Sequence, residues 1–395
     1  MIQTTPERTP LEQPVMTATQ RRSISIGLPA NTNPADRRFP LTPEGAQMLV
    51  EQGFNVLMEE GAAASIHYTD ESYRRLGVQT VSRSQALACN IVIYLSPLVP
   101  ADIIAMRRGA MLLTVSIPTV WPAEAIRNLL HRSITAIDIS LIADDRGNLP
   151  FADILAEIDG RAAMVRAASL LADSVHGKGI LLGGVAGIVP CEVTIIGSGI
   201  AATAAARSAL GSGAIVRMFD NDIYRLRQAE RELGSGVITS ALHPRVLRTA
   251  LRTADVVVYT GVSPCREIDL DMADDMKRGV IVFDLTSDPG RAFPSLPTID
   301  LAVALPRDIS PDKPFRACYV NLGSSVARTV AMALSNTFST MLRQILDCES
   351  PVNALRLLPG LQRAICTFMG KTVNRATSEK TGERCVDISL YLTLS

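Results

Sequence analysis

The amino-acid sequence predicts an α/β protein with two Rossmann-like, doubly wound domains joined by long helices. Short apolar runs alternate with helical patterns from Ser23 onward, and the alternation forms two separate series. A nucleotide-type domain is therefore expected as an insertion between two parts of another α/β domain. The predicted bounds are 24–150 plus 327–395 for the outer domain and 151–326 for the inserted one, after a disordered tail at 1–23.

The first series contains five apolar runs of strand length. A helix is expected over 41–53, where Pro43 lies in the first turn and Gly53 ends the pattern, and another over 71–77. Further helices are expected between the later strands. The predicted strands are 23–29, 55–61, 90–97, 110–118 and 134–140.

The second series lies between two long helical patterns. One runs from about Pro150 to Val175, and the other from about Ser324 to Leu346. Strands followed by helices in this order are typical of a parallel sheet. The predicted strands are 193–199, 214–220, 236–241, 254–261 and 279–286.

Composition excludes several classes of protein. The 395 residues are 47% hydrophobic and 20% charged, with a formal net charge of zero, and no basic run is interleaved with aromatic residues. We therefore expect a folded protein with no nucleic-acid partner. The longest apolar stretches have strand length, so no membrane span is predicted. The tail lacks the apolar core of a signal peptide, and seven cysteines show no paired spacing, which indicates a cytoplasmic protein without a metal site.

A glycine pattern follows the first strand of the second series. Gly197 permits a tight turn, Gly199 lets the backbone approach a pyrophosphate, and Ala202 allows close packing of helix on strand. Asp220 ends the next strand, where its carboxylate can bind both ribose hydroxyls and would repel a 2′-phosphate, so NAD is favoured over NADP. The alternative is a βαβ unit whose small residues serve packing alone. The predicted cofactor residues here are Gly197, Ser198, Gly199, Ile200, Ala201, Ala202 and Asp220.

The chain resembles alanine dehydrogenases, which share a fold with the nucleotide-binding α-chain domain of proton-translocating transhydrogenase. The resemblance is co-linear over roughly residues 24–380. It rests on RFPLTPEG, GNLPFADILAEIDGR, GILLGGVAGIVPCEVTIIGSG, FDLTSDPG, NLGSSVARTVAMALSN and GKTVNRA. It implies a substrate domain, an inserted NAD domain, a cleft between them, and a hexamer or dimer of identical chains.

The resemblance also implies roles for individual residues. Arg38 matches the arginine that binds a substrate carboxylate, and Asp288 matches an acidic residue beside nicotinamide and substrate. Without the family, Arg38 could be a solvated loop charge, Asp288 a turn cap, and Arg225 a surface residue. The remaining predicted cofactor positions are Arg225, Ser240, Gly261, Val262 and Asn321.

Two family positions depart from the pattern. Leu95 stands at the position of the family's substrate-contacting lysine, and Ile117 at that of its catalytic histidine. Neither side chain can transfer a proton, and general acid–base catalysis is worth about 10²–10⁴ in rate. The leading hypothesis is an NAD-dependent oxidoreductase of the alanine dehydrogenase family acting on an amino acid or related small carboxylate. The alternatives are a catalytically silent NAD(H)-binding paralogue that acts as sensor or partner subunit, and an alanine dehydrogenase with relocated acid/base groups.

Overall fold

The protein is described here from a computed structural model. The structure describes residues 24–262, 268–302, 316–347, 355–389 and 391. The tail predicted to be disordered, residues 1–23, lies outside these residues.

An eight-stranded sheet forms the first domain. Its order is β15-β14-β6-β5-β4-β1-β2-β3, and the strands from β6 to β3 run parallel. The C-terminal part of the chain adds β14 antiparallel to β6, and β15 antiparallel to β14. The bounds are β1 (Ser25–Leu28), β2 (Asn55–Glu59), β3 (Gln79–Val81), β4 (Ile91–Ile93), β5 (Met111–Thr114), β6 (Thr135–Asp138), β14 (Ile365–Phe368) and β15 (Lys371–Thr372).

Helices cover this sheet, and local sequence sets where they begin and end. In α1 (Pro43–Glu51), Thr42 caps the start by accepting a hydrogen bond from the Gly45 amide at 3.2 Å, and Pro43 occupies the first turn. The chain then turns at Gly53, whose φ is +97°. The other helices are α2 (Asp70–Arg74), α3 (Arg83–Leu87), α4 (Pro100–Ala105), α5 (Ala123–His131), α14 (Pro359–Arg363) and α15 (Arg375–Thr381).

A seven-stranded sheet forms the second domain. Its order is β12-β13-β11-β10-β7-β8-β9, and all its strand pairs are parallel. The strands are β7 (Glu192–Ile196), β8 (Ile215–Asp220), β9 (Val237–Ala241), β10 (Val256–Tyr259), β11 (Ile281–Asp284), β12 (Thr298–Asp300) and β13 (Ala317–Val320). The helices are α7 (Ile200–Gly211), α8 (Ile223–Leu233), α9 (Pro244–Thr253) and α10 (Leu270–Asp274).

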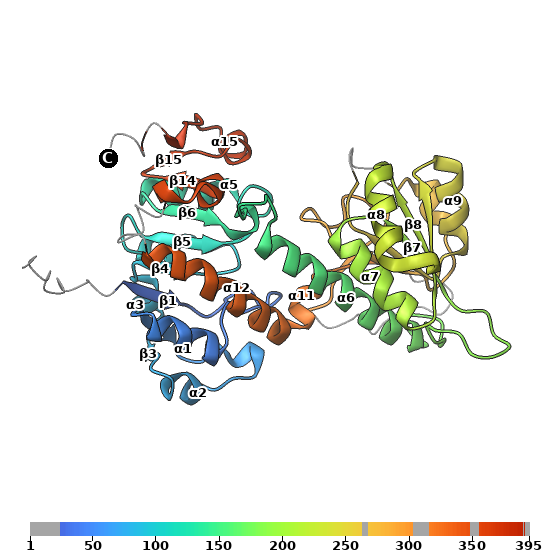
Figure 1. Ribbon diagram of the computed structural model, residues 1–395, viewed down its shortest axis with the longest axis horizontal. Coiled ribbons are helices and arrows are strands. Elements are labelled where there is room, and N and C mark those ends of the chain that lie inside the picture. Colours follow the sequence, from blue (N-terminus) through green and yellow to red (C-terminus); the bar gives the residue numbers. More distant parts are fainter. Residues whose placement is uncertain (1–23, 263–267, 303–315, 348–354, 390, 392–395) are drawn as a thin grey trace, which may run out of the picture.

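One helix runs between the two lobes of the molecule, as Figure 1 shows. This is α6 (Pro150–Ala172), and its side chains enter two cores. Phe151 and Ile158 belong to the core of the first domain, whereas side chains from Ala162 onward belong to the core of the second. Gly160 packs so closely on α7 that a Cβ there would lie 2.2 Å from the Ala201 carbonyl oxygen. The chain returns through α11 (Leu322–Ser325) and α12 (Ala327–Asp347).

The predicted fold class is confirmed: two Rossmann-like α/β domains, with one inserted into the other. Several details differ from the prediction. The first long helix ends at Ala172 instead of Val175, and the second is divided in two at Val326. Strands β3, β12 and β13 were not predicted, and the C-terminal strands β14 and β15 add an unpredicted antiparallel edge to the first sheet. No helix among the described residues is long and apolar enough to span a bilayer.

Candidate functional site

The carboxyl ends of the strands of both sheets open on one cleft between the domains. Chain order reverses direction across the sheet between β1 and β4 in the first domain and between β7 and β10 in the second. Parallel sheets bind ligands at such switch points. A cavity of about 520 Å³ lies between the domains, which is large enough for a small substrate. Its lining includes segments that follow β1, β4, β5, β11 and β13, and one face of α6.

Arg38 lines this cleft but is already engaged by a carboxylate. Its Nε donates to Asp36 Oδ1 at 2.8 Å, and its Nη2 donates to Asp36 Oδ2 at 2.6 Å. The Ser96 hydroxyl also donates to Asp36 Oδ2 at 2.6 Å. Burial raises the pKa of Asp36, but the Arg38 charge and these hydrogen bonds outweigh it and hold the pKa below its ordinary value. These two hydrogen bonds therefore fix the orientation of the Arg38 guanidinium in the cleft.

The two apolar substitutions lie in different places. Leu95 lines the cleft, beside Ser96 and Pro97. Ile117 is fully buried in a core cluster with Trp121, and its amide donates to Asp138 Oδ2 at 2.9 Å. The neighbouring Ser116 lines the cleft instead, with a left-handed backbone at φ +56°. The side chain at position 117 therefore points away from the reaction space.

Asp288 and Asn321 also differ in placement. Asp288 is exposed and lies 3.6 Å from Arg291 in a surface ion pair, while its neighbours Ser287 and Pro289 line the cleft. Asn321 lines the cleft at the end of β13, with a left-handed φ of +63°. Its side-chain amide donates to the Ala35 carbonyl of the first domain and to Asp300 of the second. Asn321 therefore links the two domains across the cleft.

A second acidic side chain faces Arg38 from α6. Ala152, Leu155, Ala156 and Asp159 line the cleft, and their spacing of three and four residues puts them on one helix face. Burial raises the pKa of Asp159 to about 6, against the opposing effects of the Arg38 charge and the Gly323 amide.

The glycine turn of the second domain fits a pyrophosphate. Gly197 has φ +113°, and a Cβ there would lie 2.1 Å from Thr260 Oγ1, so the position requires glycine. A Cβ on Gly199 would meet no atom within 4 Å, which leaves space above the start of α7. No side chain caps that helix start, so its N–H groups and dipole remain available to a phosphate. Ala202 is fully buried against the sheet, and the helix continues from Ile200 and Ala201.

Asp220 lies at the end of β8, next to the turn. It is buried, its Oδ2 accepts a hydrogen bond from the Ser198 hydroxyl at 2.6 Å, and its Oδ1 accepts one from the Asp222 amide at 2.9 Å. Each carboxylate oxygen retains a second lone pair that a ribose hydroxyl can use. The residues present therefore fit a dinucleotide.

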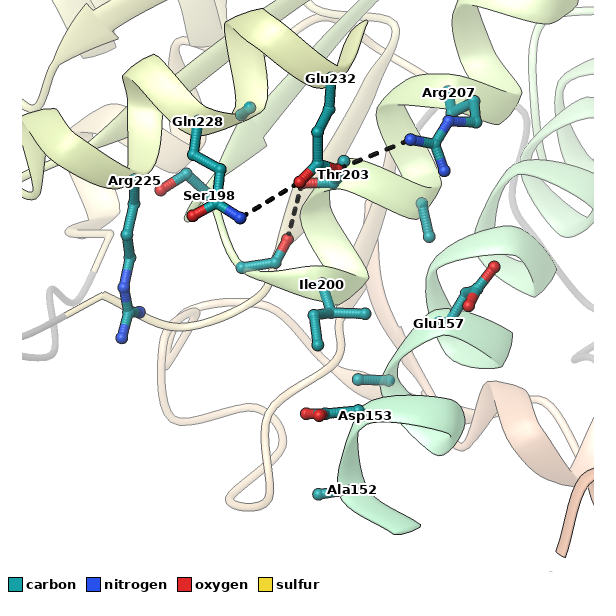
Figure 2. A pocket seen from close by; sticks show the side chains of 14 residues that line it. Ala152, Asp153, Glu157, Ser198, Ile200, Thr203, Arg207, Arg225, Gln228 and Glu232 are labelled. Carbon is teal, nitrogen blue, oxygen red and sulfur yellow. Dashed lines mark hydrogen bonds and ion pairs between the residues drawn. The ribbon is translucent and has the colours of Figure 1, made fainter. Parts of the chain in front are cut away.

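A second hollow, of about 530 Å³, lies beside the glycine turn, between residues of α6, α7 and α8 (Figure 2). It is lined by Ser198, Gly199 and Ile200, by Arg207 and by Arg225. Arg207 lies 3.6 Å from Glu232, and Arg225 lies 3.6 Å from Asp222. The hollow shares two lining residues of α6, Ala152 and Ala156, with the cleft. The glycine turn and the cleft are thus adjacent.

The other predicted adenosine residues are more scattered. Gly261 and Val262 follow β10 across the switch point from Gly197, with Gly261 at φ +94°. Ser240 lies at the end of β9 in a separate hollow with Ile238 and Arg245, and its hydroxyl donates to the Ala241 carbonyl at 3.1 Å. The structure does not bring Ser240 to the cleft.

Several cleft residues were not predicted. Asp36 stands two residues before Arg38, the first residue of RFPLTPEG, and this D-x-R spacing was a signal for the Asp36–Arg38 pair. Asp159 was visible as the acidic member of the helix face Ala152, Leu155, Ala156, Asp159. Ser116, Ser96 and Asp300 carry no sequence signal, because their place depends on how the strands and loops pack.

A glycine turn of dinucleotide type beside a cleft between two parallel-sheet domains defines a two-domain Rossmann protein of the dehydrogenase type. Two family models match this chain: alanine dehydrogenase/PNT, N-terminal domain, over residues 27–158, and alanine dehydrogenase/PNT, C-terminal domain, over residues 163–375. The second match alone covers more than half of the chain. The chain therefore belongs to the alanine dehydrogenase/PNT family, and NAD as the predicted cofactor agrees with this membership.

Individual relatives are similar over nearly their full length. An alanine dehydrogenase of Bacillus subtilis is 28% identical over 369 residues, covering 90% of this chain and 94% of the relative. One of Methanococcus maripaludis is 28% identical, covering 90% and 95%. Among solved structures, an L-alanine dehydrogenase matches with a TM-score of 0.77 at 24% identity (91% and 99% covered), and a transhydrogenase from Sinorhizobium meliloti with 0.70 at 18% (89% and 99%). These structural likenesses concern the fold.

Proposed function

We propose that this chain is an NAD-dependent oxidoreductase that acts on an amino acid or a related small carboxylate. The observation that carries the proposal is the adjacency of the glycine turn and the cleft, which share one face of α6. Gly199 and the start of α7 would hold the pyrophosphate of a dinucleotide, next to the α6 residues Ala152 and Ala156 that also line the cleft with Arg38. The chemistry that NAD supplies when bound is the acceptance of a hydride from the substrate carbon.

Arg38 is the proposed anchor for a substrate carboxylate, and Asp288 the proposed acidic partner from the second domain. Asp36 fixes the Arg38 guanidinium by two hydrogen bonds, so the arginine is preorganised before substrate arrives. Leu95 makes the adjacent wall apolar. This supports a substrate whose side chain is larger and more apolar than that of alanine.

The test is calorimetric titration with NAD and NADH, followed by a panel of amino acids and hydroxy acids offered to the NAD-bound protein at several pH values. NADH formation with an apolar amino acid or hydroxy acid is expected. Binding of the dinucleotide without turnover of any member would contradict the proposal. Absence of dinucleotide binding would also refute the assignment of the glycine turn.

A second candidate function is a catalytically silent NAD(H)-binding protein. The observation that favours it is that position 117 is buried in the core and position 95 is apolar, so neither supplies a proton-transferring group to the cleft. Introducing a lysine and a histidine into the cleft distinguishes the two candidate functions. Leu95→Lys with Ser116→His puts both groups on cleft-lining positions, whereas Leu95→Lys with Ile117→His is the matched control. Alanine oxidation by the Leu95→Lys, Ser116→His variant, and not by the control variant, would support the second candidate, a catalytically silent NAD(H)-binding protein.

We also propose a homo-oligomer, either a hexamer or a dimer, in the cytoplasm. The family resemblance supports the assembly. The cysteines support the cytoplasm, because the five described cysteines form no disulfide and four of them are buried. Gel filtration with light scattering tests the assembly. A monomer at micromolar concentration would contradict it.

A further inference from the structure

We propose that Asp159 is the proton acceptor of this cleft, taking over the acid–base role that Leu95 and the buried Ile117 cannot fill. The inference rests on the proposed oxidoreductase function and adds a residue to it. A proton acceptor must reach the reacting atoms, so it has to line the cleft.

The groups lining the cleft that can exchange protons near neutral pH are few. Among its described residues there is no histidine, lysine, cysteine or tyrosine, and the serine and threonine hydroxyls are too weakly acidic to serve alone. Four carboxylates remain: Asp36, Asp159, Asp284 and Asp300. Asp288, the acidic partner proposed above, does not line the cleft, because its exposed carboxylate pairs with Arg291 at 3.6 Å.

Three of these four carboxylates are occupied by structural hydrogen bonds. Asp36 holds Arg38 and Ser96. Asp284 is buried and accepts bonds from the Thr286 amide and hydroxyl at 3.0 and 2.7 Å and from the Gly290 amide at 2.8 Å, which shape the turn after β11.

Asp300 accepts from the Ala302 amide at 2.8 Å and from the side-chain amide of Asn321 at 3.0 and 3.1 Å. It thereby holds Asn321 in place between the domains. Each of these three carboxylates therefore maintains a contact that shapes the cleft.

Asp159 is different in both placement and proton affinity. It lines the cleft one turn beyond Ala156, the α6 residue that also lines the hollow beside the glycine turn. A Cβ built on Gly323 would lie 3.0 Å from Asp159 Oδ1 and 3.7 Å from Arg38 Cδ, so Asp159 and Arg38 flank the same glycine. Arg38 from the first domain is the charge that acts on Asp159, and burial keeps its pKa near 6, where a base is effective at neutral pH.

Oxidation of the substrate releases one hydride and one proton. The substrate carbon loses a hydride with its electron pair to the nicotinamide dinucleotide, and the carbon is oxidised. The substrate ammonium loses one proton to the Asp159 carboxylate. The nitrogen lone pair so released forms the C=N bond of an iminium ion, and Asp159 later passes the proton to water.

The experiment measures the affinity of the whole protein for NAD⁺ and for NADH by calorimetry, from about pH 5 to about pH 7.5. The oxidised ring carries a positive charge that the ionised Asp159 attracts, and the reduced ring does not. The ratio of NAD⁺ to NADH affinity is therefore expected to rise at least about threefold with pH. In Asp159→Asn this rise disappears, whereas in Glu379→Gln, which removes an exposed carboxylate on α15, it persists.

Activity gives a second readout. With a substrate found by the panel, Asp159→Asn is expected to lower kcat by about 10²-fold, and Asp159→Glu to restore part of the loss. A pH-independent affinity ratio in the unmodified protein overturns the inference without any variant. An unchanged kcat in Asp159→Asn overturns it as well, and both results leave the proposed function standing. Absence of dinucleotide binding overturns the proposed function itself.

Discussion

Replacing Asp159 by asparagine should stabilise the protein at neutral pH. The pKa of Asp159 rises from the ordinary 3.8 to about 6 on folding, mainly because of burial, so the ionised form is disfavoured in the native state. At about 1.4 kcal/mol per pH unit, this corresponds to a cost of about 3 kcal/mol above pH 6. The side chain keeps some contact with solvent in the cleft, which reduces the cost to about 2–3 kcal/mol.

The sign of the pH dependence follows from proton binding. Between pH 3.8 and about 6 the folded state binds the Asp159 proton and the unfolded state does not, so this group's contribution to stability falls as pH rises through that window. Asparagine is isosteric, can still accept from the Gly323 amide, and does not titrate. The stability difference between Asp159→Asn and the unmodified protein should therefore grow from near zero at about pH 4 to about 2–3 kcal/mol at pH 7.

The assay is thermal unfolding of both proteins without ligand across this pH range. For a domain of 150–250 residues, 1 kcal/mol shifts Tm by about 2–4 °C, so a gap of about 4–12 °C is expected at pH 7. Glu379→Gln, on the exposed side of α15, is the control and should show no such gap. A difference that is constant with pH, or one in which the variant is less stable at pH 7, would refute the reasoning.

Three further changes test the turn, the ion pair and the buried position. Gly197→Ala should abolish NADH binding in calorimetry and destabilise the fold by about 2–4 kcal/mol, since its Cβ would overlap Thr260 Oγ1; retained binding would contradict the fit of the turn. Asp36→Asn should cost about 3–5 kcal/mol in denaturant unfolding at pH 7, because Arg38 loses its buried partner, and the loss should shrink below about pH 4; a constant loss would exclude the charge as its cause. Ile117→His should lower Tm by burying an imidazole, at about 2–4 kcal/mol, without adding activity; a neutral effect would mean that position 117 opens to solvent.

The sequence predicts this fold well because local signals repeat along the chain. Apolar runs of four to five residues mark the buried parallel strands, and Pro43 and Gly53 mark both ends of α1. The second strand series was found in the same way. Strand β12 was missed because only the three residues Thr298–Asp300 pair with β13. A run this short does not show the alternation of apolar and polar residues that marks a strand.

The site could be predicted only in part. The glycine turn is local, so Gly197 and Gly199 could be assigned from spacing alone. The cleft is assembled from loops of two domains, and the sequence does not reveal which neighbour each loop residue meets. Arg38 was therefore expected as an available cation, and its pairing with Asp36 emerged from the packing. Ile117 was assigned to a catalytic position, yet the left-handed backbone at Ser116 turns that side chain into the core.

The helix α6 has a mechanical consequence for how the cleft can change width. Its first turns are anchored in one core and its later turns in the other, and at Gly160 the backbone of α7 leaves no room for sliding. A continuous helix resists bending, so it acts as a strut of fixed length between the two lobes. Motion that admits or releases a ligand is therefore expected where the chain can turn while the helix stays intact, near residues 147–149 before its first turn and at the break before Ala327.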